Sequence, residues 1–353
     1  MTKVESRQSV KNYNAIDLFK FICAILIISI HQAPFSTYNP ILHFFTKDVV
    51  ARMAVPFFFT TAGYFFFQKI DISKRSNPLE VYNQRFKKYL KHLLKIYLIW
   101  TLIYLPLNTW LRSDSIIRFA LLLIRKMLFV GGYYHLWYLS ALVFGIILVY
   151  YLLRYINIRH ITIIALGFYL IGLLGESYSC IFGRIPLVSA FSELYGDIFA
   201  KNGFIFGFVY ISAGALLSQK DIASNSKTLI GMTLVSFVLM TIEAGLLAKH
   251  TNSTPEYYAM LLPTTVFLFL YLMNLNLADN VIYKSLREMS LLIYLVHPLI
   301  IKALRYASGL IGLEEYYKAN SIIPFVCVTG CSVLFSYVMV RLSKRYKLLK
   351  VFY

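Results

Sequence analysis

The chain has 353 residues and a formal net charge of +19, with 59% hydrophobic, 17% aromatic and only 14% charged residues. Soluble domains carry ~25% charged residues, so this chain has too few polar side chains to cover the surface of a soluble domain. The same composition excludes a disordered chain, a collagen-like chain and a disulfide-rich scaffold. The composition therefore predicts an all-α integral membrane protein, whose basic residues mark cytoplasmic loops rather than a nucleic-acid partner.

Apolar segments of near-spanning length follow one another along the chain. They cover 16–33, 49–67, 92–110, 135–153, 160–175, 202–218, 228–247, 257–275, 289–304 and 321–340. Several are shorter than the ~20 residues of a straight crossing, so we expect those helices to be broken or shielded by neighbours. The sequence predicts one polytopic domain, residues 1–340, built as a bundle of about ten transmembrane helices. In the loop 111–133, the segment FALLLIRKMLF is amphipathic and is expected to lie on the membrane surface.

Lysine and arginine are unevenly distributed among the predicted loops. With the N-terminus inside, about 21 of the 35 lie in inner segments and about 10 in outer ones. The excess comes mainly from 68–91 and from the basic tail 341–353, so both termini are predicted to be cytoplasmic. A simpler explanation of these basic clusters is that they orient the chain in the membrane and contact lipid headgroups. We expect no cleavable signal, because the first apolar segment is too long and lacks a small-residue cleavage site.

The first apolar segment carries three ionisable side chains, which are costly in a bilayer unless they face a cavity or a partner. Lys20 and His31 are eleven residues apart, close to three helical turns, so they share one face with a separation of about 16 Å. Asp17 lies one turn before Lys20 on nearly the same side. A lone histidine in a helix is more often structural, but its register with a buried lysine makes His31 a candidate functional group.

Other segments carry polar groups that are candidates to converge on the same cavity. The candidate substrate contacts are Arg52, Tyr64, His135, Lys201, Glu243 and His297. Pro56 can bend the second segment, and Pro298 directly after His297 interrupts the ninth. The simplest role of Glu243 is to pair with Arg52 or Lys201. No metal site or disulfide is predicted, since the four cysteines show no CxxC pairing.

Several stretches carry a family resemblance. The first is a basic residue followed, after ten intervening residues, by a histidine, here Lys20 and His31. The others are RMAVPFFFTTAGYF, KHLLKIY, HLWYLSAL and LLIYLVHP. With these motifs the chain resembles the acyltransferase-3 family of integral membrane proteins over nearly its whole length. YLIGLLGESY, KNGFIFGF and TPEYYAMLLP are similar to the membrane part of VanT-type serine racemases, which act in D-serine-based vancomycin resistance.

The family resemblance implies a multi-pass protein of the bacterial cytoplasmic membrane that takes an acyl group from acyl-CoA, such as acetyl-CoA, and passes it to a hydroxyl acceptor. On this interpretation Lys20, Lys91 and Lys95 bind the phosphates of CoA. Neutral His31 is the general base, and Asp17 or a backbone group fixes its tautomer.

The subgroup resemblance implies a different role, the import of L-serine for racemisation. VanT-type proteins continue into a cytoplasmic racemase that carries pyridoxal phosphate, so the tail 341–353 is expected to lead toward that absent domain or a separate racemase subunit. Lys201 stands where the family often has arginine, which weakens an anion contact there. Serine import, acyl transfer and a simple membrane anchor stay open as alternatives, although the intramembrane charges argue against an anchor.

Overall fold

The computed structural model describes residues 12–70, 78–108, 115–183, 185–186, 188–189, 203–219, 225–250, 255–256 and 258–353, and these described residues contain helices but no strand. The first half comprises α1 (Asn14–Gln32), α2 (Pro40–Phe44), η1 (Phe45–Val50), η2 (Ala51–Met53), α3 (Ala54–Phe67), α4 (Pro78–Tyr104), η3 (Leu105–Leu107), α5 (Ile116–Phe129), α6 (Trp137–Leu152) and α7 (Ile158–Gly175). The second half comprises α8 (Ser179–Phe182), η5 (Gly203–Gly207), α10 (Phe208–Leu217), α11 (Ser226–His250), α12 (Leu261–Asn274), α13 (Val281–Leu310), α14 (Glu314–Ala319), α15 (Ile322–Arg345) and η6 (Lys347–Phe352).

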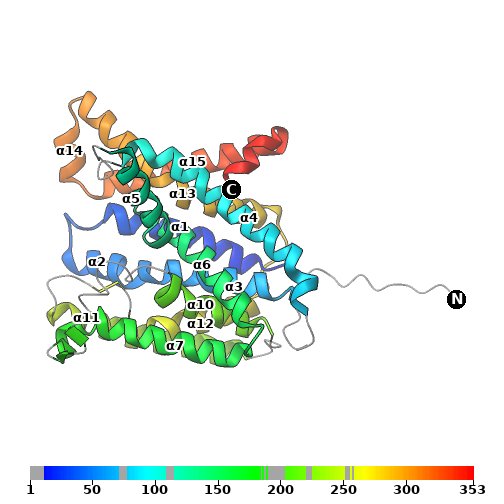
Figure 1. Cartoon of the computed structure of the whole chain (residues 1–353). Coiled ribbons are helices and arrows are strands. Elements are labelled where there is room, and N and C mark those ends of the chain that lie inside the picture. Colours follow the sequence, from blue (N-terminus) through cyan, green and yellow to red (C-terminus); the bar gives the residue numbers. More distant parts are fainter. Residues whose placement is uncertain are drawn as a thin grey trace.

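The long helices lie roughly side by side, while α4 crosses them at an angle (Figure 1). Within the described ranges, seven helical segments are long and apolar enough to cross a membrane: Asn14–Gln32, Pro40–Phe67, Tyr82–Leu107, Ile158–Gly175, Ser226–His250, Val281–Leu310 and Ile322–Arg345. Shorter apolar helices cover Trp137–Leu152, Ile205–Leu217 and Leu261–Asn274. All the apolar segments identified in the sequence fall on these helices, so the all-α membrane architecture is confirmed. The number of crossings and the cytoplasmic position of the termini stay predictions.

Asparagine side chains fix the start of three helices. Asn39 accepts a hydrogen bond from the Leu42 N–H at the start of α2, and Asn280 accepts one from the Ile282 N–H at the start of α13, both at 2.9 Å. Asn157 does the same for α7. These caps satisfy backbone donors that have no partner in the first turn of a helix.

The second apolar segment is an irregular helix. Between α2 and α3 the chain makes a π-helical turn, η1, and a 3₁₀ turn, η2, before the regular helix starts at Ala54. Pro56 has no N–H to donate to the carbonyl of Arg52, so the regular hydrogen-bond ladder cannot continue through this point. The irregular stretch positions Asp48 and Arg52, whose side chains form an ion pair at 3.2 Å.

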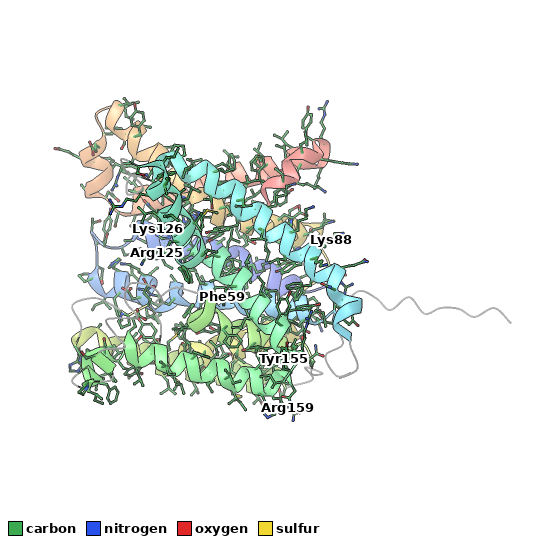
Figure 2. The ribbon with its side chains drawn as sticks, in the orientation of Figure 1. Phe59, Lys88, Arg125, Lys126, Tyr155 and Arg159 are labelled. Carbon is green, nitrogen blue, oxygen red and sulfur yellow. The ribbon has the colours of Figure 1, made fainter. Side chains whose placement is uncertain are left out.

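The loop segment predicted to be amphipathic forms helix α5. Its exposed apolar side chains include Ile117, Leu121, Ile124 and Leu128, which recur at helical spacing along one face. In Figure 2 its basic residues Arg125 and Lys126 lie in the left half of the bundle, whereas Lys88, Tyr155 and Arg159 lie in the right half. This arrangement fits a helix lying at the membrane surface.

Helices α3 and α10 pack with their backbones in close contact, because each supplies a glycine. A Cβ added at Gly214 would collide with the carbonyl oxygen of Thr60 and lie 2.7 Å from the Tyr64 nitrogen. A Cβ added at Gly63 would collide with the Ile211 carbonyl oxygen. Small residues allow this close packing, which is a main source of helix association in membranes.

We expect Gly214→Ala to destabilise the protein by about 1–3 kcal/mol, because the extra methyl group forces two helix backbones apart. Gly231→Ala on α11 is the matched control, since a Cβ there has no heavy atom within 4 Å. The measurement is thermal unfolding in detergent, in a background where the exposed Cys180, Cys327 and Cys331 are replaced by serine, so that a thiol-reactive dye reports exposure of the buried Cys23. An equal midpoint for both variants would contradict the packing argument.

Candidate functional site

A large inner cavity of about 1210 Å³ is lined by residues of α1, α3, α4, α6 and α13. Its lining includes the cationic side chains of Lys20, Lys69, Arg85, Lys284 and Arg287. Four of these five belong to the predicted inner segments 68–91 and 276–288, so the cavity lies at the end of the bundle predicted to be cytoplasmic. Its charge suits an anionic ligand.

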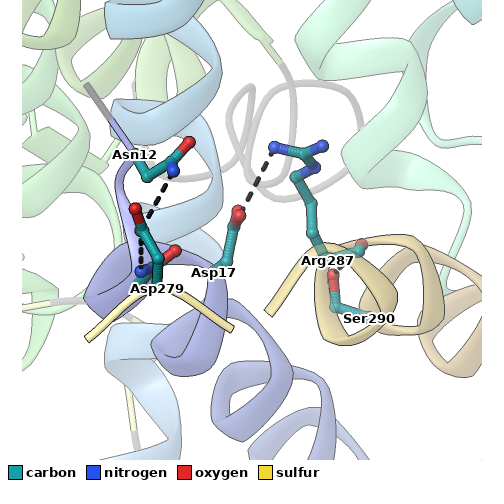
Figure 3. Close-up of polar contacts among 6 residues, drawn as sticks. Asn12, Asp17, Asp279, Arg287 and Ser290 are labelled. Carbon is teal, nitrogen blue, oxygen red and sulfur yellow. Dashed lines mark hydrogen bonds and ion pairs between the residues drawn. The ribbon is translucent and has the colours of Figure 1, made fainter. Parts of the chain in front are cut away.

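Polar contacts tie the start of α1 to α13 at this cavity (Figure 3). Asp17 Oδ2 lies 3.3 Å from Arg287 Nη1. The amides of Asn12 and Asn14 donate to Asp279 Oδ1 at 3.0 and 2.9 Å, and these hydrogen bonds lower the pKa of the Asp279 carboxyl. Asp17 and His31 are fourteen residues apart on one continuous helix, about 21 Å along its axis. The prediction that Asp17 fixes the tautomer of His31 is therefore wrong, and Asp17 belongs to the inner cavity.

A smaller outer cavity of about 180 Å³ lies near the other end of α1. The polar groups in its lining are His31, Arg52, Tyr134, His135, Tyr138, Glu256 and Tyr294. Arg52 is held by Asp48 through Nη2, while its buried Nε has no hydrogen-bond partner among the described residues. The cavity therefore combines a guanidinium, a carboxylate and an imidazole in a volume below the ~300–1,000 Å³ of pockets for drug-sized ligands.

The structure brings together three histidines that are far apart in the sequence. The rings of His31 and His297 are stacked with centroids 5.2 Å apart, and the centroids of His135 and His297 are 5.4 Å apart. His31 is exposed, whereas His135 and His297 are buried. His135 lines the outer cavity, but His297 lines neither cavity and lies behind His31. A direct substrate contact at His297, as predicted, therefore has no support from the geometry.

The backbone around His297 is held by a side chain of α4. Pro298 interrupts the ladder of α13, and the Tyr104 hydroxyl donates to the Leu295 carbonyl at 2.7 Å while accepting from the Leu299 N–H at 3.2 Å. Tyr104 thus occupies the place of a regular bond in this helix. It also contacts the His135 ring edge-on, with centroids 4.9 Å apart. Tyr104 links α4 to the histidine cluster, which sequence spacing gave no means of finding.

Two tyrosines separate the cavities. Tyr138 of α6 and Tyr294 of α13 are the residues common to both linings. The Tyr294 hydroxyl donates to the His135 carbonyl at 2.5 Å, which fixes this side chain across the boundary. A ligand that passes from one cavity to the other must therefore displace these rings.

The remaining predicted site residues lie elsewhere. Lys91 and Lys95 are exposed on α4 and line neither cavity, so the predicted phosphate contacts at these two positions are not supported by the geometry. Tyr64 also lines neither, and Lys201 lies outside the described residues. Sequence reasoning missed Glu256 as well as Lys284 and Arg287, because a charged residue beside a predicted span looks like an ordinary loop residue.

The Glu243 carboxylate forms hydrogen bonds to neighbouring protein groups. Its Oε1 accepts from the Tyr178 hydroxyl at 2.7 Å and from the Ala259 N–H at 2.5 Å, and its Oε2 accepts from the Met260 N–H at 2.9 Å. The carboxylate thus caps the start of α12, where an anion is favoured by the helix dipole. The predicted pairing of Glu243 with Arg52 is wrong, because Arg52 pairs with Asp48 instead.

The fold and the two cavities define a polytopic helical membrane protein with a charged chamber and a histidine-lined pocket. Comparison with known families matches residues 13–341 to the acyltransferase domain of the acyltransferase-3 type, and the chain belongs to this family. No solved structure matches it.

Curated relatives from Enterococcus carry racemase names. The chain is 32% identical to an amino-acid racemase of Enterococcus faecalis, over 96% of this chain and 47% of the relative. It is 30% identical to a serine/alanine racemase of Enterococcus gallinarum, over 91% of this chain and 45% of the relative. The chain thus spans about half the length of the curated relatives it matches. Both comparisons agree with the resemblance to the membrane part of VanT-type racemases.

Proposed function

We propose that the chain is the membrane domain of a serine racemase system and that it imports L-serine for conversion to D-serine in vancomycin resistance. One observation carries the proposal: Arg52 and Glu256 line the same small cavity as His31. A free amino acid is a zwitterion, so it needs a cation for its carboxylate and an anion for its ammonium. Arg52 Nε has no hydrogen-bond partner among the described residues and can contact the carboxylate, and the unpartnered ring nitrogens of His135 in the same cavity can contact the serine hydroxyl.

The position of the outer cavity supports import rather than simple binding. It lies at the predicted outer end of α1, and among the described residues Tyr138 and Tyr294 are common to its lining and to that of the inner cavity. Serine that passes this boundary enters a chamber at the predicted cytoplasmic end. A racemase with pyridoxal phosphate, either as a further domain or as a separate subunit, would receive it there. The racemase names of the relatives support this assignment.

The test is saturable binding of radiolabelled L-serine to the purified chain in lipid nanodiscs, followed by uptake into proteoliposomes. We expect unlabelled L-serine to compete fully and an amino acid with a bulky side chain, such as L-tryptophan, to compete poorly because the cavity is small. Absence of saturable binding at millimolar serine would refute the proposal. Acyl transfer and a simple membrane anchor would then remain as the candidate functions.

Acyl transfer is the second candidate, favoured by the inner cavity. Lys20 lies in its lining with Lys69, Arg85, Lys284 and Arg287, a set of cations that suits the phosphates of acyl-CoA. His31 stands about 16 Å further along the same helix, within reach of a long pantetheine arm, and would act as general base toward a hydroxyl acceptor. Acetyl-CoA should then raise the unfolding temperature of the protein, and CoA release should depend on His31. Lack of stabilisation by acetyl-CoA would remove this candidate.

A further inference from the structure

Tyr258 lies two residues after Glu256 and connects this part of the chain to the irregular helix that carries Arg52. Its side chain is fully buried, and its hydroxyl donates a hydrogen bond to the Asp48 carbonyl at 2.8 Å. Asp48 lies in η1 and pairs with Arg52 through its own side chain. One tyrosine therefore joins the segment of Glu256 to the segment of Arg52, across 210 positions of the sequence.

The backbone near Tyr258 is held as well. Its carbonyl accepts a hydrogen bond from the Tyr169 hydroxyl of α7 at 2.6 Å, and the hydroxyls of Tyr169 and Tyr210 lie 3.1 Å apart. The N–H of Glu256 donates to Glu176 Oε1 at 2.9 Å, directly after the end of α7. These bonds tie the segment to α7, whereas the Tyr258 hydroxyl ties it to η1. The segment that presents Glu256 is therefore fixed against two separate elements.

The separation of the two charges matters for the choice of ligand. Among the described residues that line the outer cavity, Arg52 supplies the guanidinium and Glu256 the carboxylate. An α-amino acid carries its ammonium and its carboxylate on the same carbon atom, whereas a β-amino acid places a further carbon between them. A site distinguishes the two only if neighbouring groups hold its own charges at a fixed spacing, because charge-assisted hydrogen bonds depend on geometry.

We propose that Tyr258 is a positioning residue that holds Glu256 at a fixed distance from Arg52 and thereby makes the outer cavity selective for α-amino acids. Tyr258 acts through its hydrogen bond to the Asp48 carbonyl and not through contact with the ligand, since it is not among the described residues that line the cavity. The inference rests on the proposed function, because it requires a zwitterionic amino acid to be the ligand of the outer cavity.

The experiment compares L-serine with L-isoserine, which has the same atoms but carries the ammonium one carbon further from the carboxylate. Both compete with radiolabelled L-serine for the purified chain in lipid nanodiscs. We expect the wild type to bind L-serine about 30-fold more tightly than L-isoserine, and Tyr258→Phe to reduce this ratio to about threefold. The phenylalanine keeps the buried ring but loses the bond to Asp48, so Glu256 can then shift to meet either ammonium.

Tyr97→Phe is the matched control. The buried Tyr97 hydroxyl donates to the Met127 carbonyl at 2.7 Å and joins α4 to α5, so this variant also loses one hydroxyl-to-carbonyl bond between elements, and it should keep the wild-type ratio. If Tyr258→Phe does not fold, Tyr169→Phe takes its place, because it releases the Tyr258 carbonyl and should lower the ratio in the same direction.

A ratio that stays at the wild-type value in the folded variant would overturn the positioning role of Tyr258. Equal affinities of the wild type for the two amino acids would overturn it too, because the site would then hold no fixed spacing. Absence of L-serine binding to the wild type would instead refute the proposed function.

Discussion

Replacing Arg52 with glutamine is expected to raise the Kd for L-serine at least about 30-fold, which corresponds to ~2 kcal/mol or more. The guanidinium is only 13% exposed, so its contact with a carboxylate would be shielded from water. The glutamine amide still has N–H donors, but it lacks the positive charge that attracts the serine carboxylate. The measurement is equilibrium binding of radiolabelled L-serine in nanodiscs.

The loss of Arg52 removes the guanidinium that pairs with the buried Asp48, so stability needs its own control. The double variant Asp48→Asn with Arg52→Gln removes both charges and should restore the thermal midpoint while leaving serine binding weak. Asp48→Asn alone keeps the guanidinium and should retain binding. An unchanged Kd in the folded Arg52→Gln protein would exclude Arg52 from the serine site.

The location of the helices could be predicted from the sequence because the bilayer imposes a simple rule on it. Each crossing requires a long apolar stretch, and the apolar segments found in the sequence fall on the observed helices. The irregular turns between α2 and α3 could not be placed in the same way. They depend on Pro56 and on the packing of Asp48 and Arg52, whereas hydropathy averages over such local features.

The candidate site was predictable where helical spacing determines geometry. Lys20 and His31 lie on α1 as expected, but they line two cavities, the inner and the outer respectively, and not the single cavity that was predicted. The meeting of His31 with His135 and His297 was expected only as a convergence of segments, since distances between helices depend on tertiary packing. Asp17 was misassigned because closeness to Lys20 was taken as closeness to His31, although the helix separates these two groups by about 21 Å.

The insertion of Tyr104 into α13 explains why proline can follow His297 in this helix. A proline removes one backbone donor and strains the next bond, and in a bilayer no water replaces them. The Tyr104 hydroxyl bonds both Leu295 and Leu299, so the interruption stays satisfied and the His297 ring keeps a defined direction. The direction of the buried His297 ring therefore depends on a residue that is almost two hundred positions away in the chain.

Glu243→Ala should destabilise the protein by about 3 kcal/mol without weakening serine binding by the folded fraction. The substitution leaves the backbone donors of Ala259 and Met260 and the Tyr178 hydroxyl without their acceptor. Glu243→Gln keeps an oxygen acceptor but loses the charge that favours the start of α12, so an intermediate loss is expected. Tyr178→Phe removes a single bond and should cost the least.

The order of thermal midpoints in detergent, wild type above Tyr178→Phe, then Glu243→Gln, then Glu243→Ala, checks this argument. The serine Kd measured below the lowest midpoint separates a structural role from a substrate contact. A Glu243→Ala protein that unfolds like the wild type but binds serine tenfold more weakly would return Glu243 to the substrate site. It would also displace Glu256 as the partner of the serine ammonium, because a small cavity with one zwitterion requires one anion.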